Sequence, residues 1–289
     1  MKKLMPVYLI LFILLTSCSN QGSSILPYDS EEPITTPITF GEGVISTEDE
    51  PEWAFTFTPD GKKMYIQRGG VSFDTLYESE YIDDKWTEPV LFTFPSPDNF
   101  NLNRVFEPFI SPDGNKFFFV SEGEGMGATD LWVSENKDGE WDKPTLLDIV
   151  NSPRNELLPS VSKKGNLYFQ TNRNGSIRGF DIYVSKFVDG KYTEPERLGE
   201  EINTTSVEES PFIAPDESYL IFRRDAAFYI SYNVDGSWSE GVLLPGEPLR
   251  GSFGTRYSPY VSPDQKYFFY SDGENIHQVD VSAMGLEIN

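Results

Sequence analysis

A repeat of about fifty residues runs through the chain and constrains its fold more than any other feature. Each copy has a turn, usually S-P-D-G, followed by a run of aromatic and β-branched residues. The five copies are FTFTPDGKKMYIQR (55–68), PFISPDGNKFFFVSE (108–122), PSVSKKGNLYFQTN (159–172), PFIAPDESYLIFRR (211–224) and PYVSPDQKYFFYSD (259–272). The markers Pro59, Pro112, Lys163, Pro215 and Pro263 are separated by 53, 51, 52 and 48 residues, so one unit is repeated with small variations in loop length.

Each copy contains four short runs rich in β-branched and aromatic residues and bounded by Gly, Pro and Asp. In the second copy these runs are FIS, KFFFVS, DLWVSE and PTLLD. Such runs indicate strands, and no helical period of adequate length competes with them. The sequence therefore predicts an all-β domain built from four-stranded antiparallel units.

Two repeated positions invite a functional interpretation but fit a structural one better. Pro and Asp preset the bend of the S-P-D-G turn, so its aspartates are interpreted as turn formers rather than catalytic acids. They are Asp60, Asp113, Asp216 and Asp264. The aromatic residues after the second turn of each unit are Trp86, Trp141, Tyr192 and Trp238. We expect these rings to pack outer strands; a sugar-binding row is the alternative, but one ring per unit is too widely spaced to line one groove.

The S-P-D-G turn, the strand D-L/I-W/Y-V-S and the turn D-G-x-W/Y-x-x-P together resemble the PD40 or WD40-like repeats of TolB-type propellers and of many bacterial lipoproteins. The resemblance covers roughly residues 36–289. It implies a β-propeller, whose blades close into a ring that protects most sheet edges. It does not imply an activity, because propellers host binding proteins and enzymes alike.

Five blades are expected, although the resemblance to TolB would suggest six. About 254 residues follow the N-terminal tether, and five units of about 51 residues use all of them. The last copy ends after NIHQVDVS, which corresponds to a third strand. The segment TPITFGEGVIST (36–47) resembles PTLLDIVNSPRNE, which ends the second copy. We therefore predict that this N-terminal strand completes the last blade and closes the ring.

The first 18 residues, MKKLMPVYLILFILLTSC, have the pattern of an export signal. Two lysines precede an apolar run of about twelve residues, which is shorter than the roughly 20 that a membrane-spanning helix needs. The sequence LTSC resembles the lipobox of bacterial lipoproteins. This implies that residues 1–17 are a signal peptide and that Cys18 carries the lipid anchor. An ordinary signal peptide that ends in a chance cysteine is the alternative.

Residues 18–35 are interpreted as the lipidated cysteine and a flexible tether, and residues 36–289 as a single propeller domain. Without residues 1–17 the chain keeps 272 residues, with 21 basic and 46 acidic side chains. Its net charge of −25 would repel anionic lipid, so the lipid anchor is the expected membrane contact. We expect a monomer in the bacterial cell envelope. Ser19 favours the outer membrane, where the domain would face the periplasm or the cell surface.

Charge and two residue counts exclude several function classes. The net charge of −23, with no basic run after residue 3, excludes a nucleic-acid partner. Cys18 and His277 are the only cysteine and histidine of the chain. These counts exclude an intrachain disulfide, a zinc site built from Cys and His, and a Cys-His catalytic pair in the folded domain. We expect no cofactor, and calcium bound by oxygen ligands is the metal that this composition allows.

Charged residues recur where the chain enters each innermost strand, which in a propeller lies at the mouth of the central channel. The acidic candidates for ligand binding there are Glu52, Glu107, Glu156 and Glu208, with Glu209 beside them. Arg256 is the basic candidate in these segments, with Arg104 and Arg154 also interleaved there. The loops between the second and third strands should reach the same face and carry the other basic candidates, Arg68, Arg173, Arg178 and Arg223, with Arg224 beside them. Opposed carboxylates and guanidinium groups can hold a polar ligand or calcium. The alternative is that they neutralise one another and stabilise contacts between blades.

Two classes of function remain. The first is a non-catalytic binding module that captures an envelope protein or a glycan at the channel face. It assigns no catalytic residue, because no nucleophile, base and orienting group are visible together. The second is a glycoside hydrolase or lyase, which would use two of the channel carboxylates. Glutamates repeated at equivalent positions favour the binding module, since catalytic residues usually differ from blade to blade.

Overall fold

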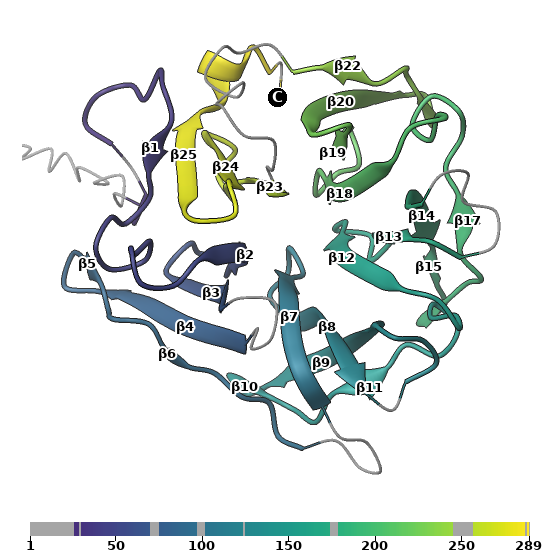
Figure 1. Cartoon of the computed structure of the whole chain (residues 1–289), viewed down its shortest axis with the longest axis horizontal. Helices are drawn as coiled ribbons and strands as arrows, with labels where there is room; N and C mark the ends of the chain where they lie inside the picture. The colour runs from purple at the N-terminus through teal and green to yellow at the C-terminus, as the bar shows by residue number, and fades with distance from the viewer. Residues whose placement is uncertain are drawn as a thin grey trace, which may run out of the picture.

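The five repeat units form five blades around a central axis in the computed structural model (Figure 1). The structure describes residues 26–28, 30–69, 75–96, 102–123, 125–173, 179–244, 257–286 and 288. The predicted all-β propeller and its five four-stranded antiparallel blades are confirmed, and the six-blade alternative is wrong. Among the described residues, no helix has both the length and the apolar character to span a membrane.

In every blade the first strand lies nearest the axis and the short fourth strand lies outermost (Figure 1). Blade 1 consists of β2 (Glu52–Phe57), β3 (Lys63–Arg68), β4 (Thr75–Ile82) and β6 (Val90–Leu91), with β5 (Lys85–Trp86) also paired to β4. Blade 2 consists of β7 (Leu102–Ile110), β8 (Lys116–Gly123), β9 (Asp130–Lys137) and β11 (Thr145–Leu146), with β10 (Glu140–Trp141) also paired to β9.

The remaining blades follow the same order. Blade 3 consists of β12 (Glu156–Val161), β13 (Leu167–Thr171), β14 (Asp181–Ser185) and β17 (Glu196–Arg197), and β15 (Phe187–Val188) pairs with β16 (Lys191–Tyr192) beside it. Blade 4 consists of β18 (Glu208–Ile213), β19 (Tyr219–Arg224), β20 (Ala227–Val234) and β22 (Val242–Leu243), with β21 (Ser237–Trp238) also paired to β20. Blade 5 contains β23 (Tyr257–Val261), β24 (Tyr267–Ser271) and β25 (Ile276–Asp280), and the 3-10 helix η2 (Val281–Met284) follows.

An aspartate holds the turn between the first two strands of a blade. Asp113 Oδ1 accepts hydrogen bonds from the Ser111 hydroxyl at 2.6 Å and from the Asn115 N–H at 3.1 Å. Asp60 accepts the equivalent pair from Thr58 and Lys62. These aspartates therefore form turns, as interpreted from the sequence. We call the end of the ring that carries these turns the turn face, and the opposite end the mouth face.

The outer strand of blade 5 comes from the N-terminal part of the chain. β1 (Ile38–Thr39) pairs antiparallel with β25, with Ile38 opposite Gln278 and Thr39 opposite His277. The Phe40 N–H extends this pairing to the Ile276 carbonyl at 2.8 Å. The prediction that an N-terminal strand completes the last blade is confirmed.

Part of the segment that we expected to be a free tether packs against the domain. The Tyr28 ring is buried, with its centroid 5.5 Å from Phe57, 5.8 Å from Tyr267 and 6.0 Å from Phe269. The Gln278 side-chain amide donates a hydrogen bond to the Tyr28 carbonyl at 2.7 Å. Gly61 makes room for this ring, because a Cβ atom there would lie 2.8 Å from it. Burial of a large aromatic side chain explains why the packed domain includes residues before 36.

The aromatic residues after the second turns join neighbouring blades. Trp141 of blade 2 donates a hydrogen bond from Nε1 to the hydroxyl of Tyr65 in blade 1 at 2.8 Å. Trp238 of blade 4 packs edge-on against Tyr168 of blade 3, with ring centroids 6.3 Å apart. Their expected packing role is therefore observed, and it ties blades together around the ring.

We expect the Tyr28→Ala substitution to destabilise the protein by about 3 kcal/mol, because it opens a cavity between blades 1 and 5 where the ring closes. Urea unfolding followed by tryptophan fluorescence measures this change. Leu91→Ala, on the exposed outer strand of blade 1, is the control and should change stability by less than about 0.5 kcal/mol. Equal stability of the Tyr28 variant and the natural protein would show that the N-terminal segment does not contribute to ring closure.

Candidate functional site

Three of the four glutamates expected at the channel do not face it. Glu52, Glu156 and Glu208 begin the innermost strands of blades 1, 3 and 4 and are fully buried. Each forms an ion pair with an arginine from the second strand of its own blade or just after it. The pairs are Glu52–Arg68 at 3.1 Å, Glu156–Arg173 at 3.0 Å and Glu208–Arg224 at 2.9 Å. These three carboxylates cannot contact a ligand, and their pairing favours the structural alternative.

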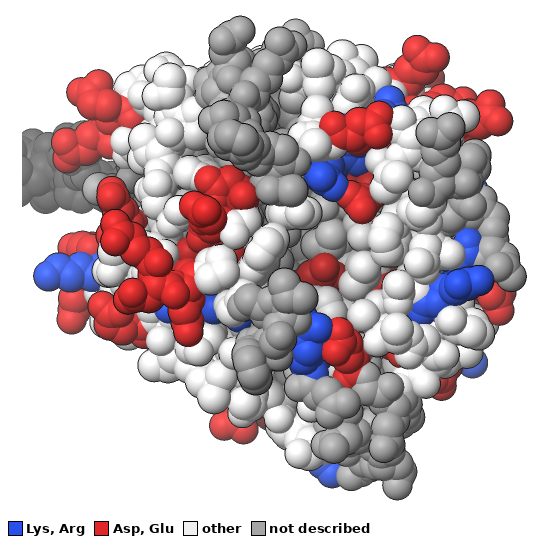
Figure 2. Space-filling model, in the orientation of Figure 1, with Lys and Arg blue, Asp and Glu red and all other residues white. Residues whose placement is uncertain are grey.

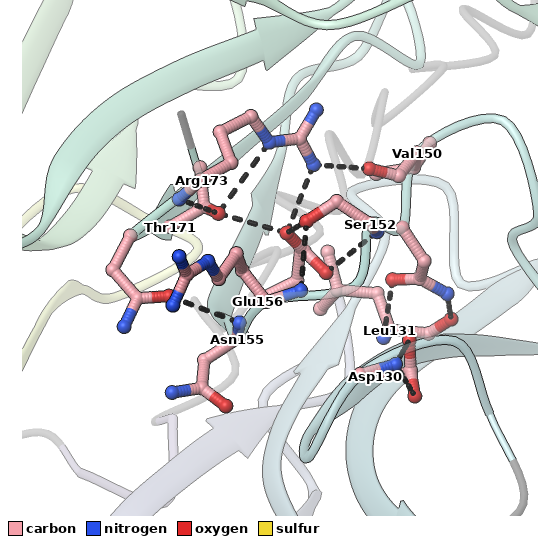
Figure 3. A network of polar contacts seen from close by, with 12 residues as sticks. Asp130, Leu131, Val150, Ser152, Asn155, Glu156, Thr171 and Arg173 are labelled. Atoms are coloured by element: carbon pink, nitrogen blue, oxygen red, sulfur yellow. Dashed lines mark hydrogen bonds and ion pairs between the residues drawn. The ribbon is translucent and has the colours of Figure 1, made fainter. Parts of the chain in front are cut away.

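Figure 3 shows the Glu156 pair in detail. Ser152 donates to the Glu156 carboxylate from its hydroxyl at 2.6 Å and from its backbone N–H at 2.9 Å, and the Thr171 hydroxyl donates at 2.8 Å. The Arg173 guanidinium also donates to the Val150 carbonyl. Val150 and Ser152 lie on the segment that arrives from blade 2, so the network holds two blades together where the chain crosses between them.

The crossings into blades 4 and 1 repeat this arrangement. Arg224 donates to the Ile202 carbonyl at 2.9 Å, and the Thr204 hydroxyl donates to Glu208 at 2.7 Å. Arg68 donates to the Ile45 carbonyl at 2.6 Å. A buried pair that also binds the incoming backbone is therefore a feature of the scaffold at three of the crossings.

The Glu52 pair has fewer hydrogen bonds than the other two. Within the described residues, no hydroxyl donates to its carboxylate as Ser152 and Thr204 do in blades 3 and 4. Burial raises the pKa of Glu52 to about 8, although the Arg68 guanidinium and the Thr47 backbone N–H both lower it. Glu52 therefore takes up a proton far more readily in the folded protein than in the unfolded chain.

This pKa predicts that the contribution of Glu52 to stability falls as the pH rises. Between pH 4.5 and about 8 the unfolded chain has lost this proton while the folded protein retains it, so deprotonation favours unfolding. Relative to Glu52→Gln, the natural protein should lose about 3 to 4 kcal/mol of unfolding free energy between pH 5 and pH 8. Urea unfolding at both pH values measures the gap. The exposed Glu140→Gln is the control, and a gap for Glu52→Gln that does not change with pH would contradict the prediction.

The fourth glutamate, Glu107, lines a pocket of about 270 Å³ at the mouth face. Trp53 and Tyr257 form one wall of this pocket, with ring centroids 5.5 Å apart. The charged and amide side chains that line it are Gln67, Arg104 and Glu107. The face drawn in Figure 2 is hollowed at the centre of the ring, and acidic side chains lie in the hollow. Aromatic rings beside groups of both charges suit a polar ligand that carries a ring or another flat group.

The arginines at the mouth have carboxylate partners but remain partly exposed. Arg104 pairs with Glu122, and Arg223 pairs with Glu209. The Arg223 guanidinium also lies 5.2 Å from the centroid of the Tyr257 ring. The Arg104–Glu122 pair is the more exposed of the two, so a ligand can replace one of its partners at lower cost than in the Arg223–Glu209 pair. Of the arginines that we expected at the channel, Arg104 thus lines the pocket and Arg223 lies beside its wall.

Strained backbone positions surround the floor of the pocket. Glu107, Leu158, Ser210 and Ser258 have φ values of 51 or 52° and each precedes a proline. The Leu158 N–H donates to Glu107 Oε2 at 2.7 Å, and the Glu107 N–H donates to Gln67 Oε1 at 3.1 Å. A side chain of one blade thus satisfies the bulged backbone of the next and orients Glu107. Because the same backbone conformation occurs in four blades, we interpret it as part of the structure of the channel. Backbone strain that serves catalysis would be expected at a single position.

The mouth pocket lacks several parts of an enzyme site. Glu107 is the one carboxylate among its described lining residues, whereas a glycoside hydrolase normally uses two. Among the described residues, no group of three or more Asp, Glu, His or Cys side chains is placed to hold a metal ion. Arg178, Arg256 and Cys18 lie outside the described residues.

A second pocket, of about 250 Å³, opens at the turn face. Its lining is largely apolar and includes Phe109, Phe212 and Tyr260, and Lys163 is its one charged residue among those described. Between the two pockets the channel narrows to a space of about 30 Å³, about enough for one or two water molecules. Among the described residues, the channel is therefore wide at its two ends and narrow between them.

The two rings of the mouth pocket and Gln67 were not expected from the sequence. Trp53, Phe106 and Tyr257 occupy the same position of the repeat, one residue before the bulge position. The corresponding residues of blades 3 and 4 are Leu157 and Glu209. A position that faces the mouth and differs between blades is a signal for ligand contact that the aligned repeats contain.

The comparisons with known proteins show the fold and not the function. No family model matches the chain, and no curated protein matches it. A solved structure of a TolB protein from Agrobacterium tumefaciens is 19% identical, covers 81% of this chain and 78% of its own, and has a TM-score of 0.52. A family-43 glycoside hydrolase is 15% identical, with coverage of 82% and 90% and a TM-score of 0.54.

A gluconolactonase from Xanthomonas campestris, 12% identical with a TM-score of 0.52, covers 84% of this chain and 88% of its own. The resemblance to TolB-type propellers thus holds for the architecture. These similar structures include enzymes as well as TolB, so shared architecture does not choose between binding and catalysis.

Proposed function

We propose that this chain is a lipid-anchored propeller of the bacterial cell envelope that binds a protein or glycan ligand at the mouth pocket without catalysing a reaction. The observation that carries the proposal is the pocket itself, where the Trp53 and Tyr257 rings stand beside Gln67, Arg104 and Glu107. Aromatic and arginine side chains in a concave site are the groups that dominate binding energy in protein interfaces. Stacking on aromatic rings also suits the flat faces of sugars.

The division of charge within the ring supports binding over catalysis. Glu156 and Glu208 are committed to buried ion pairs, and Glu52 is buried against Arg68, so none of these three carboxyl groups can reach a substrate. Glu122 and Glu209 each have an arginine partner at the mouth. A hydrolase or lyase remains the second candidate, and it would have to use Glu107 together with one of these paired glutamates.

The proposed location of the protein in the cell rests on its N-terminal sequence. Cys18 follows an apolar run of signal-peptide length and is the only cysteine of the chain. An acylated cysteine would hold the domain at a membrane, and the acidic domain would not itself adhere to anionic lipid. We place the protein at the outer membrane as a monomer, with calcium as the one metal to test for a contribution to binding.

A binding screen tests the proposed site. The mature chain with Cys18→Ser is screened against envelope proteins and glycans, with and without calcium. We expect Trp53→Ala to weaken the Kd of the ligand found by about tenfold or more. Trp238→Ala, which removes a tryptophan from the outside of blade 4, should leave the Kd within about twofold once folding is verified by circular dichroism.

Two outcomes would contradict this proposal. Equal binding by the Trp53 variant and the natural protein would move the ligand away from the mouth pocket. Release of a product from a bound glycan, abolished by Glu107→Gln, would show that the second candidate is correct and that the domain is an enzyme.

A further inference from the structure

The N-terminal segment enters the propeller at its turn face. Tyr28 packs beside Gly61, which belongs to the first turn of blade 1. The Ser30 N–H donates to the Tyr267 hydroxyl at 3.1 Å, and Tyr267 is the first residue of β24, directly after the turn of blade 5. These contacts place Tyr28 and Ser30 at the end of the ring that carries these turns.

The chain then runs along the edge of blade 5 toward the mouth face. The Ile34 carbonyl accepts a hydrogen bond from Asp280, at the end of β25, and the Phe40 N–H donates to Ile276, at its start. After a turn at Gly41, the Ile45 carbonyl meets Arg68 at the crossing into blade 1. The segment from Tyr28 to Ile45, which we call the strap, therefore spans the domain from the turn face to the mouth face.

Several independent contacts fix the turn-face end of the strap. Its Tyr28 ring contacts three aromatic rings, and its backbone accepts a hydrogen bond from Gln278. Gly61 cannot be replaced by a larger residue without displacing the Tyr28 ring. The point at which the chain leaves the domain toward its N-terminus is thus set by packing.

We propose that the strap turns the turn face of the propeller toward the membrane and the mouth pocket away from it. This inference rests on the proposed lipid anchor at Cys18. Seven residues lie between Cys18 and Leu26, and a flexible chain of these eight steps has a root-mean-square length of about 16 Å. A six-residue strand is about 20 Å long, so a tether of this length keeps the turn face, where the chain leaves the domain, nearer to the bilayer than the mouth face.

This orientation narrows the class of ligand. The mouth pocket opens toward the aqueous compartment, so its ligand is a soluble molecule or a protein that approaches from the side opposite the anchoring membrane. The apolar turn-face pocket, with Lys163 in its lining, faces the lipid surface instead. The ligand site then lies at the end of the domain that is farther from the bilayer.

Energy transfer from single labels to the membrane surface tests the orientation. Acylation consumes the thiol of Cys18, so an introduced cysteine is the one free thiol in the lipidated protein. The exposed Lys62 lies at the turn face and the exposed Arg154 at the crossing into blade 3, and each is replaced by cysteine and labelled with a donor dye. The full lipidated chain is bound to phosphatidylcholine vesicles that carry an acceptor-labelled lipid. We expect about twofold more transfer from the label at residue 62, since the labels are separated by about 20 Å along the axis.

Controls separate the orientation from the anchor. Flotation of the natural chain with the vesicles, abolished by Cys18→Ser, would show that the lipid anchor exists. If the natural chain does not float with the vesicles, both the proposed membrane location and the orientation are overturned. Flotation with equal transfer from the two labels, or with more transfer from residue 154, overturns the orientation alone. Insertion of twelve Gly and Ser residues after Gly22 leaves the strap intact and should reduce the transfer ratio toward one. An unchanged ratio in that variant would show that the short tether does not set the orientation.

Discussion

The buried carboxylate–guanidinium pair at the blade crossings is the interaction on which the ring depends. A charge removed from water is costly unless it is paired and hydrogen-bonded, and Glu156 meets this condition with Arg173, Ser152 and Thr171. Arg173 extends the network to the backbone that arrives from the preceding blade. The pair thus joins consecutive blades, and Glu208 repeats it with Arg224. Glu52 lies against Arg68 at the equivalent crossing, but it lacks a hydroxyl donor and burial raises its pKa to about 8.

The rest of the functional geometry follows from this use of charge. Three of the four glutamates are buried between the blades, which leaves Glu107 to line the mouth pocket. Glu107 accepts a hydrogen bond from the bulged backbone of blade 3 and lies near the partly exposed ion pairs of Arg104 and Arg223. The Trp53 and Tyr257 rings stand where blades 5 and 1 meet, which is also where the strap closes the ring. The contacts that close the ring therefore also position the aromatic wall of the pocket. In the orientation proposed above, the strap also determines which face of the anchored domain points away from the membrane.

Most of the architecture could be predicted from the sequence because each repeat carries its own turn and strand signals. The closing strand was predictable for the same reason, since residues 36–47 resemble the end of the second copy. The site was harder, because a strand pattern does not show whether a side chain before a bulge points into the channel or between blades. Two signals for burial were present: glutamate and arginine are 16 or 17 residues apart in all three pairs, and Ser152 and Thr204 precede their glutamates by four residues. The tether prediction missed Tyr28, one aromatic residue in a polar segment.

The most direct test of this account is a double-mutant cycle on Glu156 and Arg173, measured as the free energy of unfolding in urea. Glu156→Gln, Arg173→Met and the double variant are compared with the natural protein. We expect each single substitution to cost about 3 kcal/mol and the double variant to cost at least about 1 kcal/mol less than their sum, because the second substitution removes a partner already left unpaired. Additive effects, or single substitutions that leave stability unchanged, would contradict a scaffold held by these pairs and would return both residues to the list of ligand-binding groups.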